Sequence, residues 1–203
     1  MSNLTGLKPL SQEAAKVYRL LRHLIIDKES VAGLQEMKIP ESEFQSLQLY
    51  TYQLMYRLIA LVHYEIPASN LNALIYGLFG NAGLVHILMF TCNSPLPIRD
   101  PALISARIRA SLDMINIQAF QLAYPEMMLW IIIMGGLASM RSENQAWFIK
   151  LLAESCRAVG IAGTVELALS LSDFLWSEFY LGPIFTEFWV KVKKEIRNNC
   201  SST

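Results

Sequence analysis

Apolar residues along this chain recur mostly every three or four positions, the spacing of one face of an α-helix. The first such run, Val17, Leu20, Leu21, Leu24 and Ile25, predicts an amphipathic helix over about residues 11 to 26. The polar stretch from Asp27 to Pro40, which contains Gly33, predicts a loop, although Val31, Leu34 and Met37 could form a short helical turn. The sequence holds no Asn-Gly or Asp-Gly hairpin and no sustained alternation of apolar and polar residues, so strands are not expected.

Capping residues, glycines and prolines divide the middle of the chain. Ser42 and Gln45 form a capping-box pattern that opens a helix ending before Pro67. A shorter helix or pair of helices is expected over about 69 to 92, broken or bent near Gly77, Gly80 and Gly83. The proline-rich segment 95–101 predicts a loop, after which Asp100 and Pro101 fit the start of a helix over about 102 to 121.

The last third of the chain follows the same pattern. Pro125 fits the first turn of a helix over 125 to 140, and a second capping box, Ser142 with Gln145, predicts a helix over about 143 to 158. Gly160 and Gly163 end that helix, and Thr164 can cap another that extends to about 175. Gly182 with Pro183 starts a last helix that ends near Arg197. We therefore predict one all-α domain of about eight or nine helices over residues 1–203.

The stretch from Met127 to Met140, MMLWIIIMGGLASM, carries no charge. A membrane span needs about 20 apolar residues, and the charges at Glu126 and Arg141 leave only about 14. A core helix that is buried all round is favoured over a groove for a partner or ligand and over a membrane segment. The glycines at 135 and 136 lack the preceding strand of a phosphate-binding loop, so we expect close packing or a kink, with room left for another backbone.

Composition narrows the class of protein. Hydrophobic residues make up 53% of the chain and charged residues 17%, which favours a large core or an apolar surface toward a ligand or partner. Lys plus Arg and Asp plus Glu are both 17, so this chain lacks the basic field that nucleic-acid binding requires. Cys92, Cys156 and Cys200 fit neither a disulfide framework nor a zinc site, and with a first segment unlike a secretory signal they predict an intracellular protein.

No catalytic or cofactor motif is present in the sequence. His23, His63 and His86 fall on different predicted helices without ligands at metal spacing, the aspartates are isolated, and the nucleophile pattern GxSxG is absent. We therefore expect no enzyme, metal or cofactor. The basic residues Lys191, Lys193, Lys194 and Arg197 predict a solvated last turn of a helix rather than a phosphate-binding patch.

Aromatic and glycine residues of the second half form an ordered set of motifs. They are Pro125 with Leu129 and Trp130; Gly135, Gly136 and Ala138; Trp147 with Phe148; Phe174, Leu175 and Trp176; and Phe188 with Trp189. In their order and spacing these motifs resemble the "fungal-specific transcription factor" domain that follows binuclear zinc-cluster DNA-binding modules. The resemblance covers about 120 to 190 well and the first half weakly.

The resemblance implies an all-helical regulatory domain of a nuclear transcription regulator that senses a small molecule, associates with itself or contacts a transcriptional partner. The six-cysteine zinc module of that family is missing, so direct DNA contact by this chain is not expected. We place a candidate apolar pocket near Trp130, Met134, Phe148 and Trp176. The alternatives are an interaction scaffold or homodimerisation domain without a ligand, and a helical enzyme without a familiar motif.

Overall fold

A computed structural model describes residues 12–33, 41–63, 71–90, 101–172, 174–177 and 183–198. These residues form nine α-helices and no strand, which confirms the predicted all-α class. The helices are α1 (Gln12–Gly33), α2 (Glu41–His63), α3 (Leu71–Phe90), α4 (Pro101–Asp113), α5 (Ile117–Ala123), α6 (Pro125–Ala138), α7 (Gln145–Ala158), α8 (Thr164–Leu171) and α9 (Pro183–Asn198).

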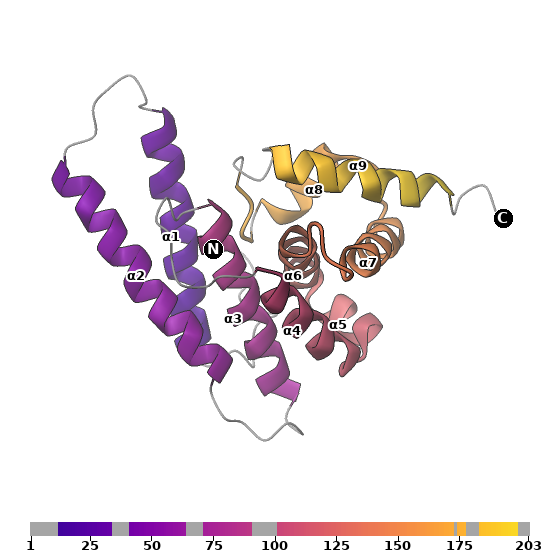
Figure 1. The fold of residues 1–203 in the computed structure, drawn as a ribbon, viewed down its shortest axis with the longest axis horizontal. Helices are drawn as coiled ribbons and strands as arrows, with labels where there is room; N and C mark the ends of the chain where they lie inside the picture. The colour runs from indigo at the N-terminus through magenta and orange to yellow at the C-terminus, as the bar shows by residue number, and fades with distance from the viewer. Residues whose placement is uncertain are drawn as a thin grey trace.

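Helix α6 lies at the centre of the arrangement (Figure 1). It packs against α3, α4, α5, α7, α8 and α9. On one side α2 packs directly against α3 and also against α1, and α2 lies at the outer edge of the molecule (Figure 1). On the other side α7, α8 and α9 cover α6. One continuous cluster of buried hydrophobic residues joins all of these helices, from Val17 in α1 to Val192 in α9.

The sequence of α6 explains its central place. Pro125 occupies the first turn, where its missing N–H costs no hydrogen bond, and every residue from Met127 to Ala138 is buried. A helix that is apolar all round is stable only when other elements cover each of its faces. The predicted core helix is therefore confirmed. Among the described residues, no helix has both the length and the apolar character needed to cross a membrane.

Two predictions in the first half were wrong. The first helix continues beyond residue 26 to Gly33, into the stretch expected to be a loop, of which residues 34–40 lie outside the described part of the chain. The polar residues of this stretch are compatible with a helix. Asp27 faces solvent, and the Glu29 carboxylate accepts a hydrogen bond of 3.0 Å from the Ser177 hydroxyl. The second helix ends at His63, before Pro67 as predicted. Helix α3 runs without a break through Gly77, Gly80 and Gly83, and at Gly80 and Gly83 the missing Cβ leaves room for side chains of neighbouring helices.

Helix ends in the second half differ from prediction where side chains make other contacts. The helix expected over 102–121 is two helices, because the Asn116 side chain accepts a bond from the Ala119 amide and starts α5. The expected capping box at Ser142 does not form, since the Ser142 hydroxyl donates to the Ser139 carbonyl and α7 begins at Gln145. Thr164 is the first residue of α8 rather than its cap, which is Gly163, and α8 ends at Leu171 rather than near 175.

Helix α2 begins at Glu41, before Ser42, which was expected to cap it, and α6 ends at Ala138, two residues before the predicted end, whereas two other boundaries agree with the sequence. Helix α7 ends at Ala158, shortly before Gly160, whose φ of +74° favours glycine. Helix α9 begins at Pro183 and ends at Asn198, one residue beyond the expected end. The proline-rich loop after Cys92 falls on residues 91–100 and so, apart from Pro101, lies outside the described residues.

Candidate functional site around the glycine pair of α6

Two phenylalanine rings lie on the adjacent glycines of α6. A Cβ atom added to Gly135 would meet the ring of Phe148, with its Cζ only 2.6 Å away, and one added to Gly136 would meet the ring of Phe188. Phe148 belongs to α7 and Phe188 to α9, and both side chains are fully buried. The close packing expected at the glycine pair is therefore present, and rings rather than another backbone fill the room.

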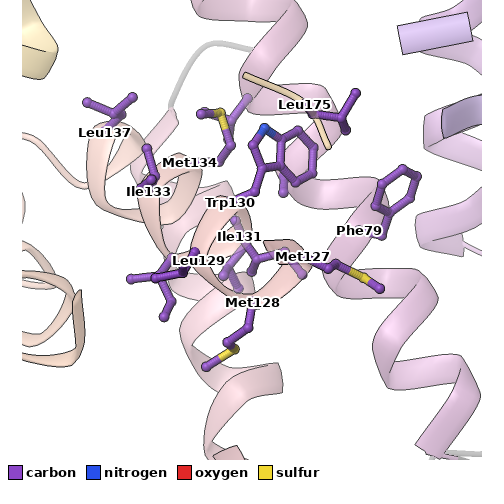
Figure 2. Packing of buried hydrophobic residues seen from close by; sticks show 14 of the residues in the cluster. Phe79, Met127, Met128, Leu129, Trp130, Ile131, Ile133, Met134, Leu137 and Leu175 are labelled. Atoms are coloured by element: carbon purple, nitrogen blue, oxygen red, sulfur yellow. The ribbon is translucent and has the colours of Figure 1, made fainter. Parts of the chain in front are cut away.

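Trp130 lies one and a half turns before the glycine pair, within a group of aromatic rings. Its ring centroid is 5.7 Å from Phe79, 5.8 Å from Phe174 and 6.4 Å from His86. Its indole is completely buried, as is Met134 one turn further along α6. Figure 2 shows Trp130 and Met134 side by side on α6, with Leu175 close to them. Helix α3 and the segment 174–177 thus cover the face of α6 that carries Trp130 and Met134.

The other two residues of the predicted pocket have different neighbours. Successive residues of an α-helix are rotated by about 100°, so Gly135, on which Phe148 lies, points about 140° away from Trp130. Trp176 is half-buried and packs edge-on against Phe185 of α9 at 6.0 Å. The structure therefore brings Trp130 and Met134 together on one face of α6 and places Phe148 on another.

The remaining family-motif residues pack around these two faces. Leu129 and Phe174 are buried, and the Trp189 ring stacks on Phe185 at 6.1 Å. Trp147 lies edge-on to Phe148 at 4.9 Å and half-buried near the surface.

The outer face of Trp147 carries a polar cluster that the sequence did not indicate. The Arg109 guanidinium lies 5.4 Å above the centre of the Trp147 ring. Its Nη1 donates to the Asn144 Oδ1 at 2.8 Å, and its Nε is 3.8 Å from an Asp113 oxygen. Cation–π and charge-assisted contacts of this kind fasten α4 to the start of α7. Nothing in the local sequence around Arg109 predicts a partner 35 positions later.

Few titratable groups lie near the core. Burial raises the pKa of the Cys156 thiol to about 12, so the thiol stays protonated and unreactive at neutral pH. The pKa of Tyr50 is also raised, first by burial and then by the Asp27 carboxylate. Within the described residues, no group of three His, Cys, Asp or Glu side chains is placed to hold a metal ion.

The histidines and the basic cluster of α9 are placed as follows. His23 is exposed and His86 is 1% exposed, while the side chain of His63 is outside the described part. Lys193, Lys194 and Arg197 face solvent, and Lys191 forms an ion pair of 2.9 Å with Glu187 one turn earlier. The basic cluster is thus the solvated end of an amphipathic helix, as its sequence indicated.

Comparison of the chain with protein-family models, with curated proteins and with solved structures gives no match.

Proposed function

We propose that this chain is the regulatory domain of a nuclear transcription factor of the fungal zinc-cluster type, acting without contacting DNA itself. One observation supports this proposal above others: motifs that carry the resemblance contact each other. The Gly-Gly element packs on the Phe of the Trp-Phe pair through Gly135 and on the Phe of the terminal Phe-Trp through Gly136. Three motifs that lie far apart in the sequence thus contact each other in the core, and we infer that they belong to one structural unit.

An effector would act on this domain by favouring one arrangement of its helices. Trp130 and Met134 are fully buried, so an apolar molecule binding at that face must displace a covering element such as segment 174–177. A ligand shifts two states only by its difference in affinity for them. Binding at Trp130 would therefore couple the position of this segment, and of α9 after it, to the concentration of an apolar small molecule.

The alternative function is a helical scaffold that binds a protein partner, or a second copy, without a small molecule. Its support is a set of large hydrophobic side chains that remain exposed on helix α2, namely Leu49, Tyr52 and Tyr56. Exposed apolar residues that gather on one surface indicate a site of protein contact.

Two measurements separate these functions. Native mass spectrometry of the purified chain reads its subunit number and any retained small molecule together, and an apolar added mass favours the effector-sensing form. Tethering the chain to a heterologous DNA-binding module, in fungal cells with a reporter gene, tests the regulatory role. We expect reporter expression to differ from that of the module alone, and a folded chain without any effect contradicts the proposal.

A further inference from the structure

Helix α2 has two apolar faces. One face, with Leu54, Met55 and Leu58, is buried against α1 and α3. The other carries a row that we call the α2 stripe: Gln45, Leu49, Tyr52, Tyr56, Ile59 and Ala60. Leu49 is 60% exposed and Tyr56 71% exposed, whereas Ile59 lies half-buried at the edge of the row. All residues of the α2 stripe except Ile59 are exposed, and α2 itself lies at an edge of the molecule (Figure 1).

The spacing within the α2 stripe is that of a helix–helix interface. From Gln45 to Ile59 the steps are four, three, four and three residues, the alternation of the inward positions of a coiled coil. At 1.5 Å per residue the stripe runs about 22 Å along the helix. Other exposed apolar side chains of the described residues, such as Leu103, Leu122 and Met114, do not form a row of this length.

The charge pattern of α2 limits what can cover the stripe. Between Phe44 and His63 the only charged residue is Arg57, which lies beside the stripe. The cores of protein interfaces are enriched in tyrosine and depleted in charged residues, as this surface is. A partner must therefore present an uncharged helix of similar spacing, and the stripe itself satisfies that requirement.

We propose that the α2 stripe pairs with the same stripe of a second copy, antiparallel, about a two-fold axis between Tyr52 and Gln53. An isologous interface places residue i on j and j on i. This axis sets Leu49 against Tyr56 of the second copy, and Gln45 against Ala60. The inference rests on the self-associating form of the proposed function and names its surface.

The same axis keeps the cations of the two copies apart. Arg57 meets Gln48 of the second copy, and the two Arg57 positions are about 13 Å apart along the helices. Charges separated by more than a Debye length of about 8–10 Å repel only weakly at physiological salt. Antiparallel pairing of identical helices is therefore free of like-charge contact at its centre.

The size of this contact predicts its strength. One helix pair of this length buries less than the ~1,200 Å² total at which specific stable interfaces begin. We therefore expect a weak, reversible dimer, of the kind found at the low end of interface sizes.

Sedimentation velocity of the full chain from low to high micromolar concentration tests the proposal. We expect a monomer–dimer equilibrium for the wild type and at least a tenfold higher dissociation constant for Leu49→Asp. Leu103→Asp is the matched control, because Leu103 is a leucine of similar exposure, 64%, on α4. A second pair of variants, Tyr56→Asp and Leu169→Asp, both at 71% exposed positions, covers the case in which one variant fails to fold.

Charge rescue tests the antiparallel register. Leu49→Asp and Tyr56→Lys are each expected to be monomeric alone and to form a heterodimer when mixed, because positions 49 and 56 face each other. Rescue by mixing Leu49→Asp with Leu49→Lys indicates a parallel pair and overturns the proposal. A wild-type chain that stays monomeric at all concentrations overturns it as well, as does loss of the dimer in Leu103→Asp to the same degree as in Leu49→Asp.

The outcome is independent of the regulatory role. If the tethered chain changes reporter expression while sedimentation shows only monomer, the regulatory proposal stands and the α2 dimer fails. If a dimer forms while the reporter does not respond, the interface stands and the regulatory proposal fails.

Discussion

At the scale of single residues, the packing of α6 depends on two glycines, whose lack of a Cβ leaves room for aromatic rings. Gly135 and Gly136 are adjacent, so they point about 100° apart and let α6 accept one ring from α7 and one from α9. Glycine inside a helix costs about 1 kcal/mol relative to alanine. The contacts with Phe148 and Phe188 offset that cost.

Substitution of the glycine pair tests this packing. Gly135→Ala and Gly136→Ala are each expected to lower the free energy of unfolding by about 1–2 kcal/mol, because overpacking outweighs the gain in helix propensity. Gly77→Ala is the control, since a Cβ there meets nothing within 4 Å, and it should add about 0.5–1 kcal/mol. Urea unfolding followed by circular dichroism measures all three.

A double substitution shows whether the ring is the cause. Phe188→Leu should cost less in the Gly136→Ala background than in the wild type, because the smaller side chain relieves the contact. Equal costs in both backgrounds contradict this packing argument.

Cys156 gives a pH dependence with a defined sign. Below pH 9, the usual pKa, the thiol is protonated in both the folded and unfolded states. Between pH 9 and about 12 the unfolded chain loses this proton while the folded chain keeps it, so stability falls as pH rises. The fall is at most about 1.4 kcal/mol per pH unit.

The variant Cys156→Ala isolates this contribution. We expect its free energy of unfolding to decline less steeply than that of the wild type between pH 9 and 11, measured by urea unfolding at each pH. Parallel pH profiles of the two proteins are the result that contradicts the assignment.

At the scale of helices, the sequence predicts interiors better than ends. The apolar run after Pro125 was enough to place α6, because burial on all sides leaves a uniform pattern. The end of α1 was missed because Glu29 is held by Ser177, a contact between residues 148 positions apart. The ring partners of the glycine pair could not be predicted for the same reason. The spacing of residues predicts the faces of a single helix. It does not predict contacts between parts of the chain that are far apart in the sequence, as these contacts are.

The stretch from Phe174 to Ser177 is fastened to α1 by a second bond. The Tyr18 hydroxyl donates to the Phe174 carbonyl at 3.3 Å, and the two rings lie 5.3 Å apart. The same hydroxyl accepts a bond of 3.4 Å from the Arg22 guanidinium, so Tyr18→Phe should lower the free energy of unfolding by about 0.5–1.5 kcal/mol for each hydrogen bond lost. Tyr56→Phe, at an exposed position and measured at a concentration where the chain is monomeric, is the control and should change it by less than about 0.5 kcal/mol. Equal effects of the two variants contradict a role for this bond.

At the scale of the whole molecule, one core extends from α1 to α9. All four tryptophans, Trp130, Trp147, Trp176 and Trp189, lie in the second half of the chain, whereas the helices are spread over both halves. Tryptophan fluorescence therefore reports on the second half and far-ultraviolet circular dichroism on the entire chain.

These two probes test whether the chain unfolds as one unit. A single cooperative core requires their urea transitions to coincide in midpoint and slope. If the dichroism shows a second transition that fluorescence lacks, the helices α1 to α3 unfold separately, and the prediction of one domain is wrong.

The central place of α6 also has a consequence for biosynthesis. Three of its covering helices, α7, α8 and α9, follow it in the chain, and about 60 residues separate the end of α6 from the end of α9. At ribosomal rates of about 5–20 residues per second, the apolar surface of α6 waits roughly 3–12 s for its full cover. During that interval the nascent chain exposes one of the most apolar segments of the protein, so its yield in cells depends on the chaperones that meet it.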